Sequence, residues 1–153
     1  TSERRPASAT IRTRGEGASR LAHRFEELEV WKTARELACR VYAISRLSAM
    51  RNERVLQDQM KRAALSISSN IAEGYERGTR KQQIEFCYIA KGSAGELRSQ
   101  VTIAHDVGVI PNDMHVELAD LCNKCCGQFG AYIAHLKRTQ RTIPGDKFSK
   151  KDS

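Results

Sequence analysis

The fold is decided by residues 53–74, which read ERVLQDQMKRAALSISSNIAEG. Apolar side chains recur there every three or four residues, at Leu56, Met60, Ala63 or Ala64, Ile67 and Ile71. This spacing places them on one face of an α-helix. We expect Asn52 to cap the first turn and Gly74 to end the helix in a left-handed conformation. The stretch therefore predicts an amphipathic helix from about residue 53 to residue 73.

Three further segments have the same periodicity, at about residues 28–47, 79–107 and 111–137. Thr79 and Gln82 form a capping box, while Gly108 and Pro111 mark the end of one helix and the start of the next. No stretch alternates with period two for long enough to predict a strand. The connections are short, so neighbouring helices must run antiparallel. The predicted fold is all-α, an antiparallel up-down-up-down four-helix bundle over residues 25–137.

The first predicted helix carries more apolar residues than one stripe requires. Trp31 lies on the main stripe, and we expect its side chain to be largely buried. Val30 and Tyr42 lie off that stripe, which predicts an intersubunit surface and a closed cyclic oligomer.

The formal net charge of +8 is concentrated in the two ends of the chain. Residues 1–24 carry six arginines against two glutamates, and residues 138–153 carry five basic against two acidic residues. Both segments have few apolar residues, so we predict disordered basic tails at 1–24 and 138–153. A basic arm favours polyanions such as nucleic acid. The alternative is a tail that only keeps the protein in solution.

The cysteines and histidines predict neither a cofactor nor a metal site. Five cysteines without a secretory signal or a long apolar run favour reduced thiols in the cytoplasm. Cys122, Cys125 and Cys126 could begin a zinc site, but two of them lie on an apolar stripe, which favours core packing. Neither a Glu-x-x-His pair nor a phosphate-binding loop occurs. We therefore predict a protein that is not an enzyme.

A set of polar residues recurs at helical spacing in the second and third predicted helices: Ser66, Asn70, Glu73, Ser93 and Glu96. A catalytic site would need a nucleophile beside a base, and no histidine is near in sequence. We interpret the set as a hydrogen-bonded network between helices, with Lys91 or Arg62 as charge partners.

Seven basic residues bracket the connection between these two helices, and we call them the basic rim: Lys61, Arg62, Arg77, Arg80, Lys81, Lys91 and Arg98. Such a group predicts a nucleic-acid-binding site that contacts phosphates. The alternative is a solvated helix face, because Glu73, Glu76 and Glu85 lie among these residues.

Four ordered motifs resemble a known family: FEELEVW at 25–31, QMKRAA at 59–64, SISSNIAEG at 66–74 and IAKGSAGEL at 89–97. The chain resembles the four-helix-bundle proteins encoded in intervening sequences of bacterial 23S ribosomal RNA genes. That family looks related to the accessory variability proteins of diversity-generating retroelements. The resemblance covers about residues 25–137. One departure is Ser68, where the family usually has proline, so no proline kink is expected.

The resemblance implies a homopentamer with a role linked to nucleic acid, beside a reverse transcriptase and its template RNA in the retroelement relatives. Two functions follow. The first is a non-enzymatic oligomeric bundle that binds nucleic acid, RNA in particular. The second is a protein-interaction scaffold with solubilising basic tails and no nucleic-acid role.

Overall fold

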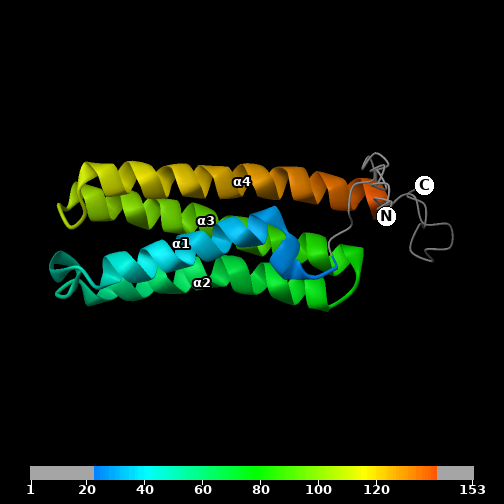
Figure 1. Ribbon diagram of the computed structural model, residues 1–153, viewed down its shortest axis with the longest axis horizontal. Coiled ribbons are helices and arrows are strands. Elements are labelled where there is room, and N and C mark those ends of the chain that lie inside the picture. The colour runs from blue at the N-terminus through cyan, green and yellow to red at the C-terminus, as the bar shows by residue number, and fades with distance from the viewer. Residues whose placement is uncertain (1–22, 141–153) are drawn as a thin grey trace, which may run out of the picture.

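The computed structural model describes residues 23–140 and contains the four expected helices (Figure 1). They are α1 (Glu29–Ser45), α2 (Arg54–Glu76), α3 (Arg80–Asp106) and α4 (Asn112–Gln140). Short 3-10 helices, Phe25–Glu27 and Ser48–Met50, precede α1 and α2. No strand occurs within residues 23–140. The predicted all-α, up-down-up-down bundle is therefore confirmed.

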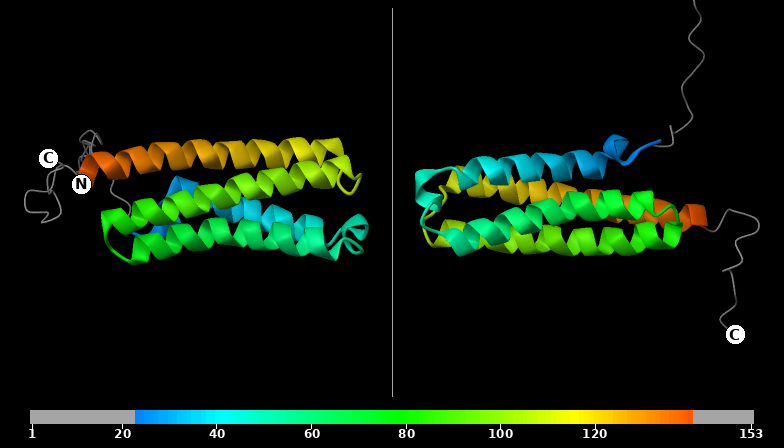
Figure 2. Two further views of the ribbon diagram at one scale, coloured as in Figure 1. Left: turned by 180° about the vertical axis from the view of Figure 1, so that it is seen from behind. Right: turned by 90° about the horizontal axis from the view of Figure 1, so that it is seen from below.

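Each helix packs against the next one along the chain, and α4 closes the bundle against α1 (Figure 2). The largest fully buried side chains include Phe129, Leu37, Ile67 and Leu97. The core faces of α1, α2 and α3 also carry buried alanines. Because a methyl group takes little space, the helices can approach closely at these positions.

Gly74 does not end α2, so that prediction is wrong. Gly74 is buried inside the helix, where an added Cβ would lie 2.6 Å from the Cβ of Phe86 on α3. The missing side chain therefore lets α2 and α3 pack tightly. The left-handed residue is Gly78, with φ of 78°, in the turn between the two helices.

The other helix ends agree with the sequence in part. Asn52 is not the N-cap of α2, because the helix starts one residue later and its cap, Glu53, makes no side-chain hydrogen bond. The Thr79 hydroxyl accepts a hydrogen bond from the Gln82 amide at 3.2 Å, which confirms the cap of α3. Gly108 has φ of 79°, as expected for the residue that ends α3.

The burial of the apolar residues of α1 differs from the predicted burial. Val30 is only 3% exposed and belongs to the core, because it lies against α4, opposite Ala131 and Tyr132. Trp31 is only partly buried and meets Phe25 edge to face, with 5.3 Å between ring centroids. Tyr42 is half-buried, with the Lys61 ammonium 5.3 Å from its ring centre. Val30 therefore gives no support for an intersubunit surface.

The bundle has two ends of different construction (Figure 1). At one end lie the start of α1, the α2–α3 turn and the end of α4; we call this the tail-bearing end, since segments 1–22 and 141–153 are attached there. At the other end, residues 46–53 and 107–111 connect the helices; we call this the closed end. The predicted disorder of the tails concerns residues that fall almost entirely outside the described range. No helix within 23–140 has the length and apolar character needed to cross a membrane.

Candidate nucleic-acid interface

The basic rim is not one continuous site. Arg77, Arg80 and Lys81 lie together around the α2–α3 turn at the tail-bearing end. Arg62 precedes Arg77 by fifteen residues of a continuous helix, which corresponds to roughly 22 Å along its axis. Only three of the seven residues that bracket the connection in sequence therefore lie at the turn itself.

The three basic residues at the turn differ in their exposure and in the partners of their charged groups. The Arg77 guanidinium pairs with Glu73 at 2.8 Å and lies 5.0 Å from the centre of the Phe86 ring. Lys81 is exposed. Arg80 is partly buried near Tyr132: burial raises the pKa of that phenol to about 12, and the positive charge of Arg80 opposes the increase. The charge of Arg80 at the start of α3 is therefore felt on α4.

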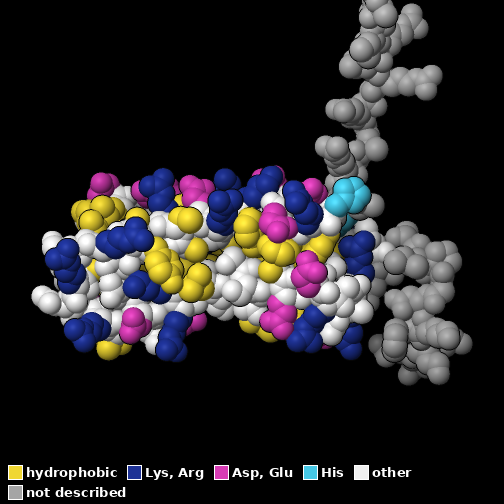
Figure 3. Space-filling model, turned by 60° about the horizontal axis from the view of Figure 1, so that its bottom comes forward, with side chains coloured by type: hydrophobic (Ala, Val, Ile, Leu, Met, Phe, Trp, Pro, Cys, Tyr) yellow, Lys and Arg dark blue, Asp and Glu magenta, His cyan; other side chains and the backbone are white. Residues whose placement is uncertain are grey.

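The remaining rim residues lie along α2 and α3 away from the turn, and Lys91 is exposed on α3. Lys61 belongs to the α1–α2 side, where its ammonium lies over the Tyr42 ring, and Arg62 is exposed on the next position of α2. Figure 3 shows that Lys and Arg alternate with Asp and Glu on this side, and exposed hydrophobic side chains lie between them. Arg98 belongs to the α3–α4 side and donates to Asn123 of α4 at 2.8 Å. The α1–α2 side therefore resembles an ordinary mixed surface.

The structure adds residues from α4 that the rim did not include. Lys137 reaches across to α3 and donates to the Tyr88 hydroxyl at 2.9 Å. Arg138 lies beside it on the last turn of α4. In an up-down-up-down bundle the fourth helix must return to the turn between the second and third helices, so the predicted topology could have indicated both residues.

The polar network between α2 and α3 is confirmed in its central part. The hydroxyls of Ser66 and Ser93 lie 2.9 Å apart, and Asn70 donates to the Ser66 hydroxyl at 2.9 Å and to its carbonyl oxygen at 2.7 Å. Glu73 and Glu96 lie outside this network and pair on the surface with Arg77 and Gln100. Lys91 and Arg62, the expected charge partners, are exposed and do not join it. These hydrogen bonds satisfy polar groups at a helix interface.

The cysteines of α4 pack in the core, as predicted. Cys122 and Cys125 are fully buried, and burial raises the pKa of each thiol to about 12. Cys126 is only partly buried. Across residues 23–140, no three His, Cys, Asp or Glu side chains are grouped so as to hold a metal ion.

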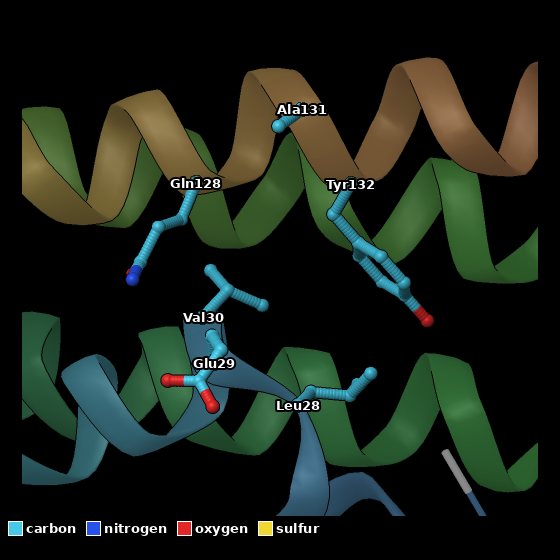
Figure 4. A pocket seen from close by; sticks show the side chains of 6 residues that line it. All are labelled: Leu28, Glu29, Val30, Gln128, Ala131 and Tyr132. Atoms are coloured by element: carbon cyan, nitrogen blue, oxygen red, sulfur yellow. The ribbon is translucent and has the colours of Figure 1, made fainter. Parts of the chain in front are cut away.

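A small apolar pocket of about 290 Å³ lies where α1 begins against α4 (Figure 4). Leu28 and Val30 face Ala131 and Tyr132 across it, and Gln128 points from α4 towards α1. The Gln128 side-chain oxygen is buried without a hydrogen-bond partner. Glu29 also lines the pocket, and its carboxylate pairs with the Lys32 ammonium at 3.0 Å.

Comparisons with known proteins agree with the fold. The profile of the family described as 23S rRNA-intervening sequence protein matches residues 26–130. A crystal structure of a protein of unknown function from the S23 ribosomal protein family of Bacteroides thetaiotaomicron superposes with a TM-score of 0.64. It is 21% identical over 69% of this chain and 95% of its own. No curated protein matches the chain.

Proposed function

Since the chain belongs to the 23S rRNA-intervening sequence protein family, we propose that it is a non-enzymatic, oligomeric bundle whose tail-bearing end binds nucleic acid, RNA in particular. The observation that carries the proposal is the convergence of positive charge at this end. Arg80 and Lys81 lie in the first turn of α3, Lys137 and Arg138 lie in the last turn of α4, and both helix ends are at this end of the bundle (Figure 1).

The two basic segments of the chain add to this convergence. Residues 1–22 contribute five arginines and residues 141–153 four basic residues, and both are attached at the same end. The acidic residues nearby, Glu73, Glu76 and Glu85, reduce the positive potential of the folded part. The attached segments therefore supply much of the attraction for a polyanion.

We further propose that the chain assembles as a closed ring, a pentamer by the family resemblance, and acts beside a protein partner such as a reverse transcriptase. A ring would repeat the tail-bearing end around an axis and multiply its charge. Light scattering at micromolar concentration should return a multiple of the 17.2 kDa chain mass. A monomer mass would reject the assembly without rejecting RNA binding.

RNA titrations at two salt concentrations test the binding itself. Full-length protein should bind more weakly at high salt, because each neutralised phosphate releases counterions. A protein reduced to residues 23–140 should bind more weakly and show a flatter salt dependence. If residues 23–140 fail to bind RNA at low salt, the folded domain has no nucleic-acid role, as the scaffold alternative predicts.

A further inference from the structure

The α3–α4 side of the bundle carries an exposed aromatic ring, Tyr88, with one lysine of α4 beside it and two further lysines on its own helix. Tyr88 is 49% exposed and is the one aromatic residue within 23–140 that is classed as exposed rather than partly or fully buried. Lys81 precedes it by two helical turns, Lys91 follows it by one turn, and Lys137 reaches it from α4. Glu85, one turn before Tyr88, is the nearest acidic residue on the same helix, so three lysines stand against one carboxylate in this region.

The faces of the Tyr88 ring are not covered by its lysine neighbour. The Lys137 nitrogen lies 2.9 Å from the hydroxyl oxygen but 5.4 Å from the ring centre. The ammonium therefore lies beyond the hydroxyl end of the ring and not above its face. A planar group can still stack on the exposed part of this ring.

Four glycines continue this surface towards the middle of the bundle, and we call them the glycine strip: Gly92, Gly95, Gly127 and Gly130. On α3 the first two follow Tyr88 by four and seven residues, and on α4 the other two follow Asn123 by the same intervals. Residues at these intervals share one helix face. The strip lies between two hydrogen bonds that join the helices, Lys137 to Tyr88 and Arg98 to Asn123. Figure 2 shows α3 and α4 side by side along this length.

The glycine strip has no packing reason inside the chain. A Cβ added at any of the four positions would meet nothing within 4 Å, in contrast to Gly74. Glycine is a much poorer helix former than alanine. Four such residues on one surface, bounded by Tyr88 with Lys137 at one end and by Arg98 at the other, leave the backbone open to close approach by a ligand.

We infer that this α3–α4 surface binds a single strand of nucleic acid, with an unpaired base stacked on Tyr88 and the sugar–phosphate backbone lying along the glycine strip between Lys137 and Arg98. The inference rests on the proposed nucleic-acid role and specifies its ligand. A duplex keeps its base faces stacked inside the helix, whereas a single strand offers them to aromatic side chains. Cations at both ends of the strip would contact phosphates.

The test uses full-length protein and a fluorescent single-stranded RNA of about 12 nucleotides, compared with the same strand annealed to its complement. Tyr88→Ala should weaken single-strand binding by about 5- to 150-fold, the range of one lost base stack. Duplex binding should change little. Tyr88→Phe should retain single-strand binding, because the ring remains and only the hydroxyl is lost. Tyr42→Ala is the matched control, since Tyr42 has a lysine neighbour on the α1–α2 side.

A second variant separates binding from folding. Replacing all four glycines of the strip by alanine should raise the melting temperature, because alanine favours the helix and nothing within the chain obstructs its methyl group. The same variant should lose single-strand affinity, because four methyl groups now cover the backbone. A more stable protein that binds less cannot be explained by unfolding.

The outcomes distinguish this inference from the proposed function. If RNA binds but neither Tyr88→Ala nor the alanine variant changes single-strand affinity, this inference is overturned and the proposed function stands. If the alanine variant changes the assembly mass and leaves RNA affinity intact, the strip is an interface between copies of the chain, which also overturns it. If full-length protein binds neither RNA at low salt, both fail together.

Discussion

The two ends of the bundle close the same core by different means. At the closed end, apolar residues of the connections cover the core: Met50 is 1% and Ile110 2% exposed, and the amides of Val109 and Ile110 both donate to the Ala104 carbonyl. The His105 and His115 rings stack there at 4.5 Å. At the tail-bearing end, all three residues of the turn Arg77–Gly78–Thr79 are exposed. The difference indicates that the connections at the closed end belong to the core, whereas the α2–α3 turn at the tail-bearing end does not.

The largest expected effect is a difference between the two ends in how much a mutation lowers the free energy of unfolding. Met50→Ala should lower the free energy of unfolding by about 2–5 kcal/mol, because it removes a buried side chain and leaves a cavity. Lys81→Ala, at the tail-bearing end, should change it by less than about 0.5 kcal/mol. Urea denaturation monitored by circular dichroism measures both values. Equal losses for the two variants would show that the ends do not differ in this way.

A smaller effect concerns how α2 and α3 meet near the tail-bearing end. Gly74→Ala should destabilise the protein by about 1–3 kcal/mol, because the new Cβ collides with that of Phe86 and forces the helices apart. Gly95→Ala is the matched control and should stabilise it by up to about 1 kcal/mol. The same denaturation measurement applies. A stabilising Gly74→Ala would mean that this contact is looser than 2.6 Å.

The smallest effect concerns the core that both ends enclose. Burial raises the pKa of Cys122 from 9.0 to about 12, so the folded state holds this proton more tightly than the unfolded state. The stability from this thiol is therefore complete below pH 9 and is lost as the pH rises towards 12. When the pH rises from 8 to 10, the free energy of unfolding of the Cys122→Ala variant should fall by about 1 kcal/mol less than that of the wild type. An identical loss in both proteins would contradict the burial of this thiol.

Much of this comparison could be predicted from the sequence, because it depends on periodicity. The helices, the Thr79 cap and the left-handed Gly108 follow from local signals. The sequence predicts the wrong role for Gly74. A glycine that ends a helix cannot be distinguished by sequence alone from a glycine that allows a neighbouring helix to pack closely. Only the position of Phe86 distinguishes them. The sequence of α1 alone predicts a surface position for Val30, because the residues that bury it belong to α4.

The candidate site was harder to predict than the fold. Residues close in sequence to one turn, such as Arg62 and Arg77, are separated by the length of a straight helix. Residues far away in sequence, such as Tyr88 and Lys137, meet because α4 returns to the same end. The glycine strip becomes visible only when the registers of α3 and α4 are known, since each pair of glycines alone is an ordinary feature of a helix.

The most direct test of the central claim reverses charge at each end in turn and measures how RNA affinity depends on salt. One protein carries Arg80→Glu and Lys81→Glu at the tail-bearing end, and the other carries Arg46→Glu and Arg51→Glu at the closed end. We expect the first pair to weaken binding and to reduce the slope of log affinity against log salt by roughly 1 to 2, one phosphate contact for each lost cation. The second pair should leave that slope close to the wild-type value. Equal reductions for both pairs, or a larger one for the closed end, would contradict the assignment of nucleic-acid binding to the tail-bearing end.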